Sequence, residues 1–91
     1  MDAQEFRANG QAVIELIAQY LETIEERPVT ADVQPGDVRH QLPAHPPTAP
    51  ESFESVLADV SNVIIPGLTH WQHPNFFAFF PGNSSYPSIL A

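Results

Sequence analysis

The sequence predicts a mainly α-helical chain: two long helices, an extended Pro-rich linker between them, and the start of a third helix. Three observations support this fold class. Apolar residues recur at helical spacing in two stretches, residues suited to capping a helix precede both, and prolines and glycines gather between them. A chain of 91 residues can bury only a thin core. We therefore expect it to pack against something larger.

The first helix is expected over residues 2–27. Asp2 is suited to cap its N-terminus, and Glu5 follows three residues later, as in a capping box. Arg27 is followed by a proline, which is expected to end the helix. Gly10 interrupts the helix and suggests that another element approaches closely there. The apolar stripe is made of Phe6, Val13, Ile14, Ile17, Tyr20, Leu21 and Ile24.

The linker is expected over residues 28–48. Seven prolines or glycines lie between residues 28 and 50, so this part should run extended over a surface and form no core of its own. Val38 and Leu42 are its expected apolar anchors.

The second helix is expected over residues 49–65. Thr48 and Glu51 have capping-box spacing, and Pro50 would lie in the first turn, where proline is tolerated. A Pro-Gly pair at Pro66 is expected to end it. Its apolar stripe is made of Phe53, Val56, Leu57, Val60 and Ile64.

The third helix is expected over residues 84–91, beginning near Ser84 or Ser85. A serine before a proline and then an apolar run is typical of a helix start. Residues 68–83 between the second and third helices hold two prolines and few helix formers, so we expect extended structure with turns. Because the sequence stops where a helix begins, we expect the chain to be a piece of a longer protein.

The charge balance argues against two classes of partner. Three arginines and no lysine stand against eleven acidic residues, which gives a net charge of −8. Such a chain repels phosphate backbones and anionic lipids, so we expect no nucleic-acid or membrane-surface partner. Cysteine is absent, which excludes a disulfide or a thiolate metal site. The acidic N-terminus does not resemble a signal peptide, and we expect a cytoplasmic location.

The last 32 residues, from Val60 onwards, contain no Asp, Glu, Lys or Arg, yet they hold four of the six phenylalanines and the only tryptophan. Charged groups are excluded from sites that lack water, whereas aromatic rings gain most from burial there. We therefore expect this stretch to be covered by another part of the protein or by a partner.

The residues of this stretch leave several interpretations open. His70 and His73, with His40 and His45, offer nitrogen ligands for zinc, but no acidic residue follows Asp59, and hydrogen-bonded histidines at an interface are the simpler interpretation. Ser84 and Ser85 lack the glycine setting of a nucleophilic serine and are better explained as helix caps. On composition alone, the row Phe76, Phe77, Phe79 and Phe80 is plain core.

The order of the residues in this stretch points to a family. The string from Thr69 to Pro81 reads Thr-His-Trp-Gln-His-Pro-Asn-Phe-Phe-Ala-Phe-Phe-Pro, and Ser-Ser-Tyr-Pro follows from Ser84. It resembles the N-terminal signature of the pyridoxal-phosphate-dependent aromatic amino-acid decarboxylases (group II), which include decarboxylases of dihydroxyphenylalanine, tryptophan, tyrosine and histidine. Further landmarks in family order are Glu5-Phe6-Arg7, Glu26-Arg27-Pro28-Val29, Val33-Gln34-Pro35-Gly36, Leu42-Pro43 and Pro66-Gly67-Leu68.

The resemblance implies both a fold and a role. In that family these residues form a helical segment ahead of a large transferase-type domain that binds the cofactor, and they pack across the two-fold partner of a dimer. The implied activity is release of carbon dioxide from an aromatic amino acid to give the amine. The implied substrate-pocket residues are Trp71, Phe79, Phe80, Pro81 and Gly82.

The resemblance assigns neither catalytic nor cofactor-binding residues to this chain. No lysine is present to hold pyridoxal phosphate covalently, so the cofactor would be held by residues outside the chain. Two departures put the substrate in question. Gly82 stands where relatives that use catechols typically have threonine, and Phe79 stands where many have tyrosine, so both positions lose a hydroxyl.

A rival interpretation comes from a different class of protein. The chain could be a stand-alone acidic helical module that mediates dimerisation or partner binding without catalysis. A companion polypeptide that carries the missing lysine would favour the decarboxylase, and the lack of one would favour the module.

Overall fold

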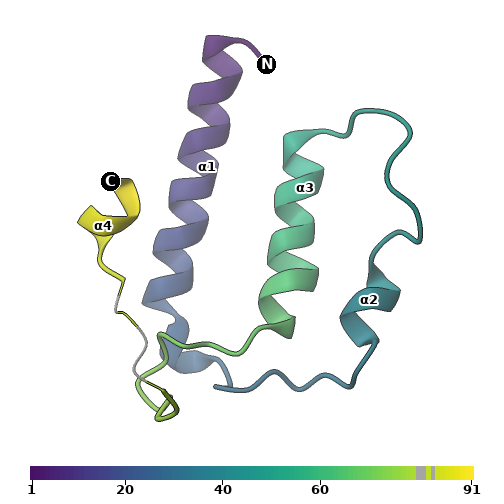
Figure 1. The fold of residues 1–91 in the computed structure, drawn as a ribbon. Helices are drawn as coiled ribbons and strands as arrows, with labels where there is room; N and C mark the ends of the chain where they lie inside the picture. The colour runs from purple at the N-terminus through teal and green to yellow at the C-terminus, as the bar shows by residue number, and fades with distance from the viewer. Residues whose placement is uncertain (80–81, 83) are drawn as a thin grey trace.

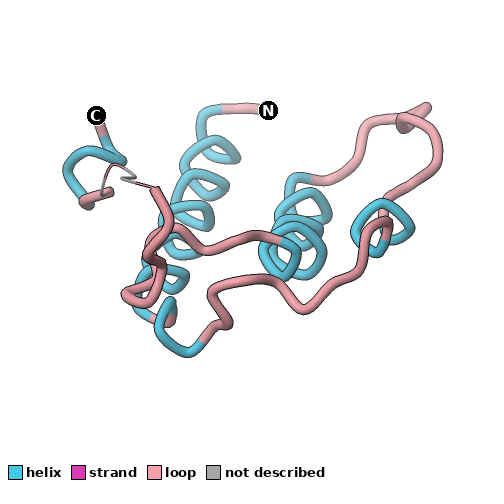
Figure 2. The backbone as a smooth tube through the Cα atoms, turned by 60° about the horizontal axis from the view of Figure 1, so that its bottom comes forward, coloured by secondary structure: helices cyan, strands magenta, loops and turns pink. Residues whose placement is uncertain are grey.

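In the computed structural model, the structure describes residues 1–79, 82 and 84–91. These residues form helices and loops and contain no strand (Figure 2). The mainly α-helical fold class expected from the sequence is therefore confirmed for the described part of the chain.

The helices lie beside one another in one layer (Figure 1). The long helix α1 (Ala3–Glu22) packs beside α3 (Phe53–Asp59). The short helix α2 (Asp37–Gln41) lies on the far side of α3, and α4 (Tyr86–Leu90) lies on the far side of α1. The loop that carries the aromatic residues runs past the C-terminal end of α1 and leads to α4.

This arrangement has little interior of its own. The radius of gyration is 15.4 Å and the extents are 42 × 35 × 20 Å, whereas a compact domain of this length would have a radius of about 12 Å. Among the described residues, the buried apolar side chains are Ile24 and Ile65. Because domains are normally built from two packed layers, a single layer with this small core needs a further surface to cover it.

The start of α1 matches the expectation. The Asp2 carboxylate accepts hydrogen bonds from the backbone N–H groups of Gln4 and Glu5, both at 2.8 Å, and the Glu5 carboxylate accepts from the N–H of Asp2 at 2.8 Å. The capping box is therefore confirmed.

The end of α1 differs from the expected helix over residues 2–27. The α-helix stops at Glu22, and a short 3₁₀ turn, η1 (Ile24–Glu26), follows. The Thr23 hydroxyl donates a hydrogen bond to the carbonyl of Gln19 at 2.8 Å, a local bond that competes with regular helix geometry. Arg27 then takes an extended backbone conformation, as expected for a residue before proline.

The expectation for Gly10 is wrong for the described part of the chain. A Cβ atom placed at Gly10 would meet no described atom within 4 Å. No neighbouring element within this part therefore requires a glycine there.

The linker contains a short helix, α2, whereas the sequence pattern predicts extended structure there. Pro35 and Gly36 make a turn in which Gly36 has a φ of 97°, a conformation that glycine adopts without strain. The Asp37 carboxylate then accepts a hydrogen bond from the N–H of Gln34 at 2.8 Å, and α2 begins at Asp37. The Pro-Gly-Asp signal was visible in the sequence.

The second helix begins later than expected. Its cap is Ser52, whose hydroxyl accepts a hydrogen bond from the N–H of Ser55 at 3.1 Å. The expected cap at Thr48 with Glu51 is wrong, because Ser52 itself is extended and leaves Pro50 outside the helix. The backbone stays helical after α3, as a π turn η2 (Val60–Ile64) and a 3₁₀ turn η3 (Ile65–Gly67).

The start of the third helix matches the expectation. Ser85 caps α4: its hydroxyl accepts a hydrogen bond from the N–H of Ser88, and the Ser88 hydroxyl accepts from the N–H of Ser85. Among the described residues, no helix is both long and apolar enough to cross a membrane.

Gly67 of η3 packs closely against Val38 of α2. A Cβ atom on Gly67 would lie 2.5 Å from Cγ2 of Val38. Val38 is β-branched and rotates with difficulty, so we expect Gly67→Ala to lower the free energy of unfolding by about 1–3 kcal/mol. Denaturant unfolding of the wild-type and variant proteins measures the change.

A matched control separates this contact from a general glycine effect. In a Val38→Ala background the offending methyl group is absent, so Gly67→Ala should cost less than half as much there. Equal costs in the two backgrounds would show that the contact with Val38 is not the cause.

Candidate functional site

Three aromatic residues after η3 form a cluster of rings, of which one pair is stacked and two pairs are tilted. The ring centroids of Trp71 and Phe76 are 5.9 Å apart with planes 18° from parallel, and Phe79 lies 6.0 Å from Trp71 and 6.4 Å from Phe76. These distances are typical of attractive ring packing. We call Trp71, Phe76 and Phe79 the aromatic cluster.

The cluster is packed internally but open on its outer side. Trp71 is 52% exposed and Phe79 is 76% exposed. Rings that pack together and still face outward provide an apolar wall for another flat group.

Phe79 also carries backbone strain. Its φ is 61°, and it is the only described residue other than glycine with a positive φ. For a bulky side chain this conformation is rare and costs on the order of 1–3 kcal/mol. Strain of this kind gathers at functional sites, where the surroundings hold a residue in a required orientation.

The two histidines beside the cluster point inward. His70 is 2% exposed and His73 is 8% exposed. The Tyr20 hydroxyl and Nδ1 of His70 lie 2.7 Å apart, which joins α1 to the aromatic loop. Nδ1 of His73 accepts a hydrogen bond from the N–H of Asn75 at 2.9 Å. The expected hydrogen bonding of these histidines is confirmed for both, and their place at an interface stays a prediction.

The surroundings keep this pair uncharged. Burial raises the pKa of the Tyr20 hydroxyl, and the positive charge of Arg27 lowers it by less. Burial lowers the pKa of His70, and the charges of Arg27 and His73 lower it further. Near neutral pH the phenol therefore keeps its proton and the imidazole is neutral. We assign the Tyr20 hydroxyl as the donor and Nδ1 of His70 as the acceptor.

Arg27 completes the surroundings of this pair. Its guanidinium carbon lies 5.4 Å from the centroid of the Tyr20 ring, which is a cation–π contact. Its Nε is buried and has no hydrogen-bond partner among the described residues. Arg27 thus lies over the face of the Tyr20 ring, while His70 binds the Tyr20 hydroxyl.

Gln72 links the two ends of the aromatic loop. Its side-chain nitrogen donates a hydrogen bond to the carbonyl of Gly82, and its side-chain oxygen accepts one from the N–H of Ser84, both at 3.3 Å. The Gln72 side chain thus connects the start of the aromatic loop to Gly82 and Ser84 near its end.

The expected pocket residues can now be placed. Trp71 and Phe79 lie together in the aromatic cluster, and Gly82 lies at the loop end that Gln72 binds. Phe80 and Pro81 lie outside the described residues. Phe76 belongs to the aromatic row of the sequence but not to the expected pocket residues, and in a segment expected to be extended its spacing from Trp71 and Phe79 gives no signal for a shared face.

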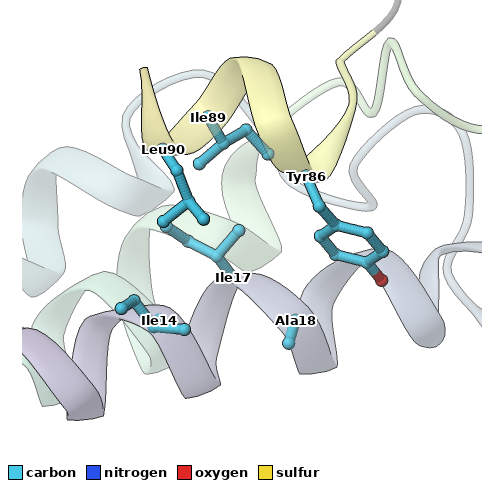
Figure 3. Close-up of a pocket in the computed structure, with 6 residues that line it drawn as sticks. All are labelled: Ile14, Ile17, Ala18, Tyr86, Ile89 and Leu90. Atoms are coloured by element: carbon cyan, nitrogen blue, oxygen red, sulfur yellow. The ribbon is translucent and has the colours of Figure 1, made fainter.

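An apolar groove between α1 and α4 lies apart from the aromatic cluster. It is formed where α4 packs on α1, and Figure 3 shows Leu90 directed toward Ile17. Its lining offers one polar atom, the hydroxyl of Tyr86. The lining residues are Ile14, Ile17, Ala18, Tyr86, Ile89 and Leu90. This groove explains how α4 is held and offers no catalytic groups.

The residues for other chemistries are not assembled in the described part of the chain. No group of three or more His, Cys, Asp or Glu residues there is placed to hold a metal ion. His40 and His45 are exposed, unlike His70 and His73. Ser85 caps α4, and the N–H of Ser84 binds Gln72.

Comparison with known proteins places this geometry in a family. Residues 35–91 match the model of the pyridoxal-dependent decarboxylase conserved domain. The chain therefore belongs to the pyridoxal-dependent decarboxylase family, and the resemblance found in the sequence is confirmed.

Three relatives illustrate the match. The chain is 50% identical over 91 residues to aromatic-L-amino-acid decarboxylase of Mus musculus. It is 47% identical over 90 residues to tyrosine decarboxylase of Papaver somniferum and 44% identical over 90 residues to histidine decarboxylase of Homo sapiens. These matches cover 99–100% of this chain but only 19%, 18% and 14% of the three relatives.

Solved structures agree with these relatives. The fold matches the crystal structure of Rhodiola rosea 4-hydroxyphenylacetaldehyde synthase with a TM-score of 0.90 and 47% identity. It matches Catharanthus roseus tryptophan decarboxylase in complex with L-tryptophan with a TM-score of 0.88 and 38% identity. Each match covers 99% of this chain and 19% of the other chain.

The residues that the structure describes do not form a site for pyridoxal phosphate. No lysine is present, and the three arginines are dispersed along a chain with a net charge of −8. Arg27 lies against the ring of Tyr20. The cofactor that the family name implies must therefore be held by other residues.

Proposed function

We propose that this chain is the N-terminal segment of a pyridoxal-phosphate-dependent aromatic amino-acid decarboxylase, in which it lines the substrate pocket and packs against a two-fold partner. Membership of the family supports the reaction class. The observation that carries the role of the segment is the aromatic cluster, whose rings pack together while the outer faces of Trp71 and Phe79 stay open.

The chemistry of the cluster suits an aromatic side chain as its occupant. A substrate ring placed against Trp71 and Phe79 would gain ring packing and the burial of apolar surface. The stretch from Val60 onwards holds no charged residue, so it would also exclude water from the pocket. Loss of a carboxylate is favoured where water is excluded.

The cofactor has a separate place in this proposal. Pyridoxal phosphate, bound by residues outside this chain, supplies the electron sink for decarboxylation. The residues described here bind and orient the substrate side chain and keep water out. None of them acts as the acid, base or nucleophile.

The exposed face of α1 supports the proposed partner. Phe6 is 68% exposed and Ile14 is 54% exposed, although both belong to the apolar stripe of the helix. The exposed apolar residues on α1 form a surface that the cofactor domain and a second subunit would cover.

The proposal is tested by reconstituting the enzyme. The chain is combined with the polypeptide encoded directly after it, pyridoxal phosphate is added, and carbon dioxide release from tryptophan, tyrosine, dihydroxyphenylalanine and histidine is measured. Activity that requires both polypeptides is the expected result. Absence of a complex and of activity would favour the stand-alone interaction module.

The product must be identified in the same assay. One similar structure is that of a 4-hydroxyphenylacetaldehyde synthase, so mass spectrometry should distinguish an amine from an aldehyde. The amine is the expected product, and an aldehyde would overturn the assignment as a simple decarboxylase.

Gly82 provides a prediction about substrate choice. A Cβ atom at Gly82 would meet no described atom within 4 Å, and its φ lies outside the region that favours glycine. Gly82→Thr should therefore fit and add a hydroxyl group at the loop end. Because one hydrogen bond contributes about 0.5–1.5 kcal/mol, we expect kcat/KM for dihydroxyphenylalanine to rise roughly 3- to 10-fold relative to phenylalanine.

The control for this change is Gly82→Val, which has a similar shape but no hydroxyl group. It should leave the preference between the two substrates within about twofold of the wild-type ratio. A valine variant that shifts the preference as far as threonine does would assign the effect to shape.

A further inference from the structure

The contacts of His70 tie the aromatic loop to two other parts of the chain. Its ring is bound by the Tyr20 hydroxyl of α1, 50 residues earlier, at 2.7 Å. Its backbone N–H donates to the carbonyl of Val29 at 2.9 Å, and its own carbonyl accepts from the N–H of His73 at 3.0 Å. With 2% of its surface exposed, His70 is fixed through its ring and through its backbone.

Buried and exposed residues stand next to each other at this anchor. His70 and His73 are buried, whereas Trp71, which directly follows His70 in the same turn, is 52% exposed and stacks on Phe76. The backbone direction at Trp71 is set by the bonds on the residue before it. A displacement of the turn that begins at His70 would carry the indole with it, away from Phe76 and Phe79.

We propose that Tyr20 and His70 are positioning residues that fix Trp71, and with it the wall against which the substrate ring binds. The inference rests on the proposed function, since it assigns the role of this pair in the same pocket. The hydroxyl of Tyr20 restrains the imidazole, the imidazole restrains the turn, and the turn presents the indole. Tyr20 itself does not touch the substrate.

If Trp71 forms a wall of the substrate pocket, its displacement should change KM and kcat in different ways. A surface that binds the substrate ring binds it equally in the ground state and in the transition state, so its displacement raises KM and leaves kcat nearly unchanged. A purely structural defect would instead lower the amount of active enzyme, which reduces the apparent kcat at unchanged KM.

The test uses Tyr20→Phe in the reconstituted holoenzyme. This change removes one oxygen atom, keeps the ring beneath Arg27 and leaves Nδ1 of His70 without its donor. We expect KM for the preferred aromatic amino acid to rise about tenfold, with kcat within twofold of wild type. The matched control is Tyr86→Phe, which removes the same atom from the apolar groove between α1 and α4 and should change neither constant.

A replacement of His70 that keeps a hydrogen-bond acceptor for Tyr20 should preserve the wild-type KM. Asparagine places an acceptor near the position of Nδ1, so His70→Asn should keep KM within about threefold of wild type, whereas His70→Leu should match Tyr20→Phe. An unchanged KM in Tyr20→Phe, or a fall in kcat alone, would overturn the proposal.

A second measurement does not depend on activity. In the same reconstituted protein, cleavage after Trp71 by chymotrypsin is followed by mass spectrometry. We expect about fivefold faster cleavage in Tyr20→Phe and no change in Tyr86→Phe. If the wild-type protein releases no carbon dioxide, the proposed function fails. Equal cleavage rates in wild type and Tyr20→Phe would overturn the positioning role.

Discussion

Replacing Trp71 by alanine is expected to lower kcat/KM for the preferred aromatic amino acid on the order of 50-fold in the reconstituted enzyme. The indole is the largest ring of the aromatic cluster and packs against both Phe76 and Phe79. Its removal takes away one wall of the proposed pocket and the support of the other two rings. Burial of an aromatic ring contributes about 2–3 kcal/mol, and every 1.4 kcal/mol corresponds to a factor of about ten. Steady-state kinetics of carbon dioxide release measure the effect.

The control for this prediction lies in the same loop. Phe77 is 86% exposed and stacks on no ring among the described residues, so Phe77→Ala should change kcat/KM by less than about threefold. Absorbance of the bound cofactor should be unchanged in both variants, because neither residue is assigned to its site. A loss in Phe77→Ala as large as that in Trp71→Ala would show that the whole loop matters and not the cluster.

The features that could be predicted from the sequence are local ones. The cap at Asp2 depends on residues two and three positions away, and the start of α4 at Ser85 depends on three residues. The family was also recognisable, because its landmarks follow one another along the chain in a fixed order. Each of these signals lies within a short window of sequence.

The features that could not be predicted depend on competition between neighbouring residues for the same role, or on contacts between residues far apart in the sequence. Ser52 and Thr48 are both good caps, and only the path of the chain after Pro50 decides for Ser52. Thr23 ends α1 by a bond to Gln19 that helical periodicity does not reveal. The pattern of apolar residues determines neither the first residue of α3 nor the last residue of α1.

The candidate site was foreseen only in part for the same reason. Its aromatic residues stand close together in the sequence, and Trp71 and Phe79 were selected. The residues that hold them were not, because Tyr20 reads as one more apolar position on the stripe of the first helix. Its partner His70 is 50 residues away, and no periodicity links the two.

The stability of the folded protein is expected to fall as the pH drops below about 6.5, with His70 as the cause. Burial and the positive charges of Arg27 and His73 lower the pKa of His70 in the folded state, and Tyr20 faces it with an uncharged hydroxyl. The unfolded chain therefore binds a proton at a higher pH than the folded chain does.

The sign and the range of this effect follow from that difference. Above the unfolded pKa of about 6.5 the imidazole is neutral in both states, and the folded protein keeps its full stability. As the pH falls below that value, the unfolded state gains a proton first, so stability declines by at most about 1.4 kcal/mol per pH unit until the folded pKa is reached.

The variant His70→Asn tests this prediction, because asparagine cannot titrate and should remove this part of the pH dependence. The measurement is the difference in thermal midpoint between wild type and His70→Asn in the reconstituted protein from pH 8 to pH 5. We expect the difference to move in favour of the variant below pH 6.5, because protonation of His70 would place a further positive charge beside Arg27 at a buried position. A constant difference over the whole range would show that His70 takes up its proton in the folded protein as easily as in the unfolded chain.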